Sequence, residues 1–203
     1  MQAYRFDNSG AIVDDDDVLP VEQDRELAII AAAKQNPHAF APLYRHYVGL
    51  VYHYALGRLR DPHRAEDATS QTFTRALQAL PSFNPKKRPD GTTFRGWLMT
   101  IARNTVIDAS RRHRPADSLD LAAPVSADPG PEYLAIASAE RDRVHAAIAR
   151  LPESQRQVIE LRLVGLRGPE IADVLDMSTG AVKTANYRAY QRLRELLRET
   201  DHA

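Results

Sequence analysis

Apolar residues recur at helical spacing along most of this chain, and the alternation expected of β-strands is nearly absent. Two helix starts are marked clearly: Asn36-Pro37 and Asp61-Pro62 each place a capping side chain before a proline at the first helical position. The pattern predicts helices over residues 22–35, 37–59, 62–80 and 94–112. We therefore expect a helical domain over 22–114, preceded by a disordered acidic tail over 1–21.

A second helical domain is expected over residues 134–199. Residues 115–133 combine several prolines with acidic side chains and contain no lysine or arginine, which is typical of a linker. Helical spacing then returns, with helices expected over 153–164, 169–175 and 178–198 that have the layout of a helix-turn-helix. The predicted fold class is all-α, with two small helical domains joined by an acidic, proline-rich linker.

Charge is distributed unevenly, although 27 Lys+Arg balance 27 Asp+Glu over the 203 residues. Residues 1–37 carry 3 basic and 8 acidic side chains, whereas residues 38–114 carry 13 and 5. Residues 115–139 carry 0 and 4, and residues 140–203 carry 11 and 10. The neutral total therefore hides a block of net charge +8 over 38–114, where an anionic partner such as nucleic acid is expected.

The last predicted helix, which Ser178 caps, has two distinct faces. One face is apolar, and the other carries side chains able to contact bases and phosphates in a major groove. That second face holds Lys183, Thr184, Tyr187, Arg188, Gln191 and Arg194. The spacing fits a DNA-recognition helix and a solvated amphipathic helix about equally well.

Two earlier helices carry further polar patterns. The helix over 62–80 has a stripe of Asp67, Gln71, Thr74 and Gln78 opposite an apolar side that includes Leu77. By spacing alone this stripe favours an ordinary water-facing surface. The helix over 94–112 and the loop before it combine Trp97 with many basic groups, a set suited to holding a single strand of nucleic acid. Core packing is the alternative for Trp97.

Enzyme chemistry finds little support in the sequence. The chain has no cysteine, no phosphate-binding glycine motif, no HExxH and no GxSxG. His46 and His53 are seven residues apart without further metal ligands, so we expect no metal, no cofactor and no catalytic residue. No apolar run approaches the roughly 18 residues that span a bilayer, and the first residues lack a secretory signal. We therefore expect a cytoplasmic protein without membrane insertion.

Several segments together resemble a bacterial sigma factor of the extracytoplasmic-function (group 4) type in the sigma-70 family. RAEDATSQTFTRALQAL (64–80) resembles the family's polymerase-binding helix, and FRGWLMTIARNTVIDASRRHR (94–114) closely resembles its promoter-melting helix. LPESQRQVIELRLVGLRGPEIADVLDMSTGAVKTANYRAYQRLREL (151–196) is similar to the region 4 domain, which recognises the −35 element. The order of the motifs, with an acidic proline-rich linker between them, makes the resemblance specific.

The resemblance implies a non-catalytic subunit that directs core RNA polymerase to promoters. Region 2 would dock on the clamp coiled coil of the largest subunit and region 4 on the flap of the second-largest subunit. An anti-sigma factor is a further expected partner. The polymerase-binding residues would be Asp67, Gln71, Thr74 and Gln78. The −10 residues would be Lys86, Lys87, Arg88, Arg95, Trp97, Arg103, Asn104, Arg111 and Arg112. The −35 residues would be Arg156, Ser178, Thr179, Lys183, Thr184, Tyr187 and Arg188.

Two other hypotheses compete with the sigma factor. A stand-alone helix-turn-helix regulator would bind duplex DNA without polymerase, but it leaves residues 64–114 unexplained. An enzyme with an appended DNA-binding domain would need an active-site motif that the sequence does not display. Tight binding to duplex DNA together with indifference to polymerase would favour the regulator.

Overall fold

The computed structural model describes residues 20–84, 93–112 and 143–201. Every regular element in these ranges is a helix, which confirms the predicted all-α class. Contacts between Cα atoms divide the chain into two compact units, Met1–His46 and Tyr47–Ala203, which are described in turn. Most of the predicted tail (1–19), most of the basic loop (85–92) and the predicted linker lie outside the described residues.

The first unit contains α1 (Pro20–Gln35), the 3-10 helix η1 (Pro37–Phe40) and the beginning of α2 (Ala41–Leu59). Asn36 caps η1 as predicted, because its Oδ1 accepts a hydrogen bond from the His38 amide at 3.0 Å. The first turn after Asn36 is a 3-10 helix, so the predicted single helix over 37–59 is two elements. α1 packs against η1, and Ile30, Ala33 and Phe40 are buried.

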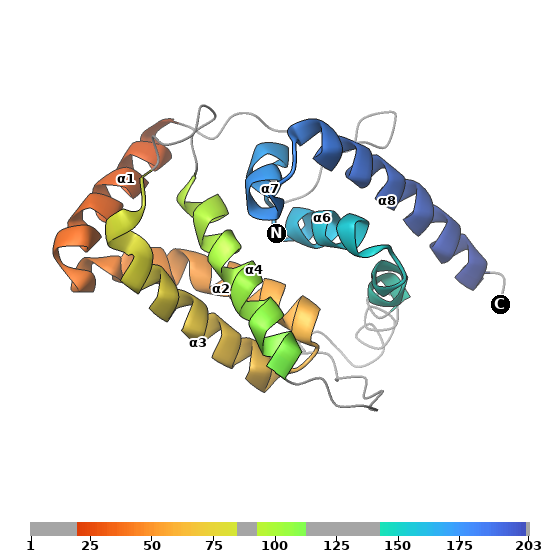
Figure 1. The fold of residues 1–203 in the computed structure, drawn as a ribbon, viewed down its shortest axis with the longest axis horizontal. Helices are drawn as coiled ribbons and strands as arrows, with labels where there is room; N and C mark the ends of the chain where they lie inside the picture. Colours follow the sequence, from red (N-terminus) through yellow and green to blue (C-terminus); the bar gives the residue numbers. More distant parts are fainter. Residues whose placement is uncertain (1–19, 85–92, 113–142, 202–203) are drawn as a thin grey trace, which may run out of the picture. The chain divides into compact units, whose positions relative to one another are not determined.

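The second unit includes the paired helices α3 (Pro62–Ala79) and α4 (Phe94–Arg112), with the 3-10 helix η2 (Leu80–Ser82) following α3. Asp61 caps α3 by accepting a hydrogen bond from the Arg64 amide at 3.0 Å. α3 and α4 lie side by side (Figure 1), and the residues that they bury are mainly apolar. The buried apolar residues of this pair are Ala65, Ala68, Phe73, Ala76, Phe94, Leu98, Met99, Ala102 and Val106.

An aromatic cluster surrounds the start of α4. The Phe94 ring lies 5.5 Å from Tyr47, 5.7 Å from Phe83 and 5.4 Å from Trp97, and the Phe83 and Trp97 centroids are 4.9 Å apart. Aromatic pairs at these separations add stabilisation beyond the burial of their surface. The cluster fixes the direction in which α4 begins.

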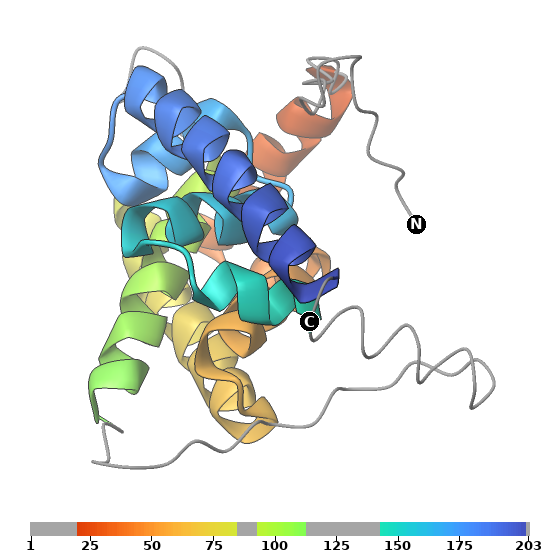
Figure 2. The same ribbon diagram turned by 90° about the vertical axis from the view of Figure 1, so that its right-hand side faces the viewer.

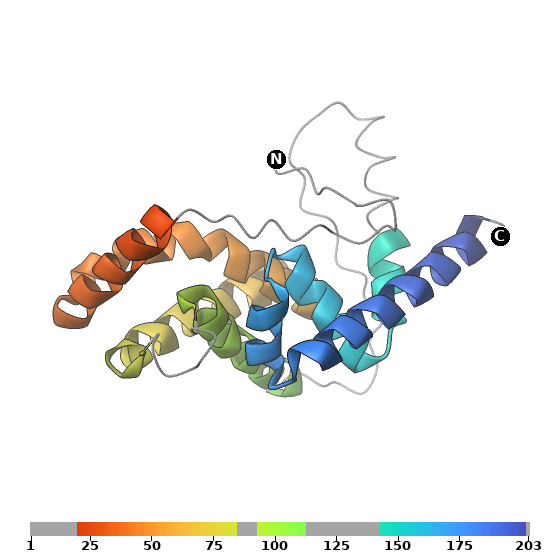
Figure 3. The ribbon, with the colours of Figure 1, turned by 90° about the horizontal axis from the view of Figure 1, so that it is seen from above.

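The remainder of the second unit comprises helical residues 143–149, α6 (Glu153–Leu163), α7 (Gly168–Leu175) and α8 (Thr179–Asp201). α8 packs on both α6 and α7, and Figures 1 and 2 show α8 running along these shorter helices. Viewed from above, α7 leads into the start of α8 (Figure 3). One cluster of the core consists of Ala147, Ile148, Leu151, Ile159, Ala189 and Leu196.

Three residues set the turns of this helix-turn-helix. Gly165 follows α6 with φ of +83°, a conformation that L side chains rarely adopt. Asp176 ends α7 at φ 53°, in the left-handed region that aspartate tolerates better than most residues. Ser178 then caps α8, accepting a hydrogen bond from the Ala181 amide at 3.2 Å as predicted. The turn at Gly165 brings α6 and α7 into contact, and the turn at Asp176 brings α7 and α8 into contact.

No helix among the described residues is both long enough and apolar enough to cross a bilayer.

Candidate nucleic-acid interface

The two faces of α8 are as the sequence predicts. Val182, Ala189 and Leu196 are buried. The opposite face is exposed along its length, and it consists of Lys183, Thr184, Tyr187, Arg188, Gln191 and Arg194. Ser178 and Thr179 are exposed at the start of the helix. The helix thus presents one continuous polar face on which three of the six side chains are basic, and its role in contacting DNA stays a prediction.

Tyr187 is the most exposed large hydrophobic residue among those described, with 66% of its surface accessible. It stands between Thr184 and Arg188 on the polar face, where its ring is free to contact bases or a thymine methyl group. Arg156, which the resemblance also assigns to the −35 site, lies elsewhere, on α6. It forms an ion pair with Glu153, and its Nε is 3.9 Å from Glu160.

The polar stripe of α3 is exposed at Asp67, Thr74 and Gln78 and half-buried at Gln71. The prediction that Leu77 belongs to the buried side is wrong, since Leu77 is 37% exposed. Leu77 lies one turn after Thr74, so an apolar side chain borders the polar stripe. The sequence pattern gives no sign of this surface position, because periodicity assigns a leucine at the edge of a stripe to the core.

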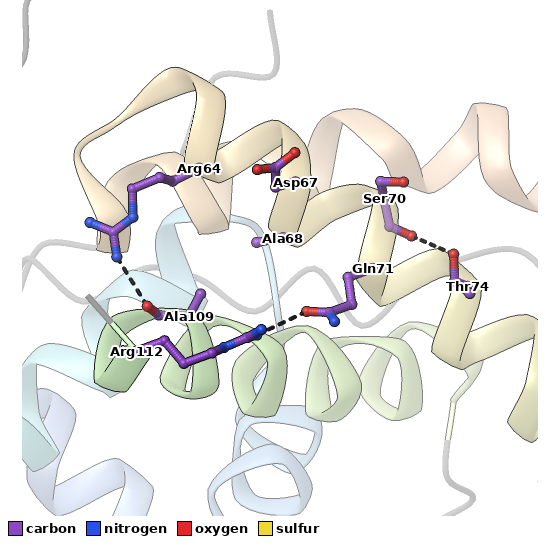
Figure 4. Close-up of a pocket in the computed structure, with 8 residues that line it drawn as sticks. All are labelled: Arg64, Asp67, Ala68, Ser70, Gln71, Thr74, Ala109 and Arg112. Carbon is purple, nitrogen blue, oxygen red and sulfur yellow. Dashed lines mark hydrogen bonds between the residues drawn. The ribbon is translucent and has the colours of Figure 1, made fainter. Parts of the chain in front are cut away.

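A groove of about 430 Å³ separates the exposed sides of α3 and α4 (Figure 4). Its lining combines residues of both helices: Arg64, Asp67, Ala68, Ser70, Gln71, Thr74, Ala109 and Arg112. Arg112 Nη2 donates to Gln71 Oε1 at 3.3 Å, and Arg64 Nη2 donates to the Ala109 carbonyl at 3.1 Å. The groove therefore joins part of the predicted polymerase-binding stripe to one of the predicted −10 residues.

The chemistry of this groove is that of a mixed polar surface. The guanidinium groups of Arg64 and Arg112 and the carboxylate of Asp67 are its charged groups. The remaining polar lining consists of the Gln71 amide and the hydroxyls of Ser70 and Thr74. Guanidinium groups donate hydrogen bonds to carboxylates and phosphates, and amides can both donate and accept. The surface can therefore hold a protein segment or a nucleotide, but it contains no arrangement for bond-making chemistry.

The predicted −10 residues fall into separate groups on α4. Asn104, Arg111 and Arg112 are exposed along the later turns. Arg95 instead forms an ion pair with Glu170 of α7 at 2.7 Å, and Arg103 Nη2 lies 3.5 Å from Gln157 Oε1 of α6. Trp97 is half-buried within the aromatic cluster, so its ring serves the packing of α4. Lys86, Lys87 and Arg88 lie outside the described residues.

Glu170 is the buried acid at the centre of one polar cluster. Burial raises the pKa of Glu170, but the Arg95 guanidinium, the Arg167 amide and the Thr93 hydroxyl outweigh it, so that the pKa is lowered. Its carboxylate accepts hydrogen bonds from Thr93 Oγ1 at 2.8 Å and from the Arg167 amide at 2.8 Å. The charged form of Glu170 is therefore fully paired.

A second polar cluster centres on Arg58. Its guanidinium contacts Glu153 at 2.9 Å and Glu160 at 3.0 Å. Burial raises the pKa of Glu160, an effect that Arg58 only partly opposes. Burial disfavours the charged form of Arg58, but the two carboxylates outweigh it and raise its pKa. The sequence pattern predicts no role for Arg58, Glu160 or Glu170, since their partners are far away along the chain.

Within the described ranges, no group of three or more histidine or acidic side chains is placed to hold a metal ion.

The sequence matches two models of one protein family. Residues 43–116 match the model of sigma-70 region 2, and residues 141–193 match the model of sigma-70 region 4. The chain is 36% identical to the RNA polymerase sigma factor CnrH of Cupriavidus metallidurans over 191 residues, which cover 88% of this chain and 96% of CnrH. It is 32% identical to the ECF sigma factor ShbA of Streptomyces griseus, over 86% of this chain and 98% of ShbA.

Other relatives are longer than this chain. The ECF sigma factor BldN of Streptomyces coelicolor is 36% identical over 78% of this chain, and the match spans 60% of BldN. Among solved structures, CnrH in complex with the cytosolic domain of CnrY superimposes with a TM-score of 0.64 at 28% identity, covering 85% of this chain and 96% of CnrH. Two region models in the expected order and relatives matched over nearly their whole length lead to one conclusion: the chain belongs to the extracytoplasmic-function sigma factors of the sigma-70 family.

Proposed function

We propose that this chain binds core RNA polymerase and directs it to promoters, with no catalytic chemistry of its own. The observation that carries the proposal is the pair of separate polar surfaces, on α3–α4 and on α8, each in a segment that matches a sigma region. A protein that binds RNA polymerase must be in the compartment that holds the transcribed DNA, so we propose that this chain is cytoplasmic. The proposed domains are residues 22–114 and 134–199, with a linker over 115–133.

The polymerase surface is proposed to be the stripe of Asp67, Gln71, Thr74 and Gln78 on α3, extended by Leu77. The clamp coiled coil of the largest subunit would cover this stripe, and the second-largest subunit's flap would contact region 4. An exposed leucine beside charged and amide groups suits a protein partner, because interfaces combine an apolar centre with a polar rim. Ser70 is exposed one turn before Thr74, and its small side chain adds little bulk beside the stripe.

The −10 surface is proposed to lie along α4 and the preceding loop. Asn104, Arg111 and Arg112 are exposed there, and Lys86, Lys87 and Arg88 precede the helix in sequence. Basic groups would neutralise phosphates of the non-template strand, while amide groups contact bases. Holding a base outside the stack costs a few kcal/mol, which such contacts must offset.

The −35 surface is proposed to be the polar face of α8, entering the major groove of duplex DNA. Lys183 and Arg188 would neutralise phosphates or contact bases, and Thr184 and Tyr187 lie between them. Ser178 and Thr179 at the helix start would contact the DNA backbone. Arg156 belongs to this surface only if its ion pair with Glu153 is exchanged for a phosphate.

An anti-sigma factor is a further proposed partner. CnrH was solved in complex with the cytosolic domain of CnrY, and a Bartonella quintana sigma factor that shares the fold, at 22% identity and a TM-score of 0.60, was solved in complex with the anti-sigma factor NepR. A partner of that class would compete with polymerase for the exposed surfaces of this chain.

Reconstituted transcription tests the proposed function. The purified chain is added to bacterial core RNA polymerase on a library of promoter fragments, and the transcripts are sequenced. Discrete start sites that require the chain are expected. Absence of such starts together with absence of core binding would overturn the proposal, and tight binding to duplex DNA that ignores polymerase would favour a stand-alone regulator.

A further inference from the structure

An acidic side chain stands within the proposed −10 surface of α4. Asp108 follows Asn104 by four residues and precedes Arg112 by four, so the three side chains are neighbours on one side of the helix. The Asp108 side chain is 46% exposed, and Asn104 and Arg112 are exposed on either side of it. A carboxylate at this place would repel the phosphates of a bound strand. A surface that holds nucleic acid therefore needs a group that neutralises Asp108.

Arg75 of α3 supplies that neutralising charge. Its Nη1 donates to Asp108 Oδ2 at 3.0 Å and to Thr105 Oγ1 at 3.2 Å. The Thr105 hydroxyl donates its own hydrogen to the Ile101 carbonyl at 2.9 Å, so its oxygen is left to accept from Arg75. Thr105 is fully buried. The packing of α3 on α4 thus fixes the guanidinium between a buried hydroxyl and the Asp108 carboxylate.

The Asp108 carboxylate keeps one oxygen open to another partner. Within the described ranges, Oδ2 bonds to Arg75 while Oδ1 accepts no hydrogen bond. Arg112 does not engage the carboxylate, because its Nε donates to the Asp108 carbonyl at 3.3 Å and its Nη2 donates to Gln71 Oε1 at 3.3 Å. Since a carboxylate can accept about four hydrogen bonds, Asp108 retains acceptor capacity on a half-exposed side chain beside Asn104.

Such an acceptor distinguishes bases by a group that only some of them carry. Adenine and cytosine present an exocyclic amino group, which donates to a carboxylate oxygen. Thymine and guanine present a carbonyl oxygen at the corresponding position, which a carboxylate oxygen repels. The Asn104 amide, one turn away, both donates and accepts, so it can pair with either class. Asp108 is therefore the group on this side of α4 that suits an amino-bearing base.

We propose that Asp108 selects an amino-bearing base, adenine or cytosine, at one position of the −10 strand, and that Arg75 is the positioning residue that orients and neutralises its carboxylate. The proposal rests on the proposed function, since it uses α4 as the −10 surface. Asp108 Oδ1 accepts a hydrogen bond from the amino group of the base, while Oδ2 stays with Arg75. The exposed guanidinium groups of Arg111 and Arg112 bind neighbouring phosphates of the same strand.

Base frequencies at the −10 element test the selection. Core polymerase with the wild-type chain or with Asp108→Asn transcribes a promoter library randomised over that element, and the transcripts are sequenced. An amide can donate to the carbonyl oxygen of thymine or guanine, so Asp108→Asn should raise the frequency of these bases at one position by about fivefold or more. Asp24→Asn removes the same charge from an exposed position of α1 and should leave every base frequency unchanged.

The competing interpretation of Asp108 is an ion pair that only ties α3 to α4. In that case Asp108→Asn would lower the number of transcripts without changing which promoters are selected. Unchanged base frequencies in Asp108→Asn would therefore overturn the selection, while the proposed function stands because discrete starts still form. Absence of discrete starts and of core binding with the wild-type chain would instead overturn the proposed function.

The role of Arg75 is tested with a labelled single-stranded −10 oligonucleotide and holoenzyme assembled at saturating core polymerase. Arg75→Gln leaves the carboxylate unpaired and should weaken oligonucleotide binding, measured by fluorescence anisotropy, by about threefold or more. Arg75→Lys keeps the charge and should bind within about twofold of wild type. The double variant Arg75→Gln/Asp108→Asn should regain binding, because the repelling charge is gone. Wild-type affinity in Arg75→Gln, or a double variant as weak as Arg75→Gln, would overturn the positioning role.

Discussion

Gln71 of α3 accepts a hydrogen bond from Arg112 of α4 at 3.3 Å, across the groove between the two helices. One residue belongs to the proposed polymerase surface and the other to the proposed −10 surface. The bond is exposed to solvent, so it is weak and easily exchanged for a bond to a ligand. A partner that binds Gln71 would release Arg112 to bind a phosphate. The proposed polymerase surface and the proposed −10 surface therefore lie on the two sides of one groove.

Charge reversal at the groove tests the polymerase surface. Asp67→Arg should weaken binding to core polymerase at least tenfold, because a rim carboxylate becomes a repelling cation. Glu66→Arg makes the same charge change at the neighbouring, exposed position outside the stripe. Fluorescence anisotropy of labelled chain titrated with core polymerase measures both. Equal weakening by the two variants would assign the effect to net charge.

Leu77 and Leu80 form a matched pair for separating binding from stability. Leu77→Ala should change the free energy of unfolding by less than about 0.5 kcal/mol, because the side chain is 37% exposed, yet weaken core binding. Leu80→Ala should cost about 2–5 kcal/mol of stability, since Leu80 is 1% exposed. Urea unfolding and core titration measure the two effects. Full core affinity in Leu77→Ala would remove Leu77 from the interface.

Removal of a guanidinium from α8 tests the −35 surface. Arg188→Ala should weaken binding of the holoenzyme to its selected promoters by about 1–3 kcal/mol if Arg188 contacts a base. Arg198→Ala, which removes an exposed arginine beyond the proposed face, should have little effect. Promoter binding at fixed salt is measured, because phosphate contacts vary with ionic strength. Weakening that is uniform over all promoter sequences would assign Arg188 to a phosphate.

The pairing of Glu170 predicts a pH-dependent contribution to stability. Burial raises the pKa of this carboxyl, but its hydrogen bonds and Arg95 lower it overall, below the unpaired value of 4.5. The charged form therefore stabilises the folded chain fully above about pH 4.5, and this stabilisation is lost as pH falls through the lower folded pKa. Glu170→Gln should lower the Tm at pH 7, and the difference from wild type should shrink toward pH 3.

The exposed Glu66 provides the control for this titration. Glu66→Gln should leave the Tm nearly unchanged across the same pH range, because its side chain is 66% exposed and its contact with His63 is long, at 3.9 Å. A Tm difference for Glu170→Gln that stays constant with pH would assign the effect to lost packing.

Local signals predicted the helices well, because caps and periodicity act over a few residues. Asn36, Asp61 and Ser178 each accept the hydrogen bond expected of a cap. The faces of α8 follow from the spacing of its apolar residues alone. The error at Leu77 arises because periodicity does not show where the neighbouring helix stops covering an edge.

Contacts between distant segments were beyond sequence reasoning. Arg95 and Glu170 are 75 residues apart, and Arg58 and Glu160 are 102 apart. A buried carboxylate on an amphipathic helix gives no sign of which arginine neutralises it. The same limit applies to Gln71 and Arg112, since the sequence assigned them to different partners and the packing of α3 on α4 brings them together.

Trp97 is the single tryptophan of the chain, and it packs against the aromatic rings of Phe83 and Phe94, two residues from Arg95. Its intrinsic fluorescence therefore comes from one known place at the start of α4. An emission change on mixing with polymerase or DNA would be attributable to that place without any added label, so the aromatic cluster gives this chain its own optical probe.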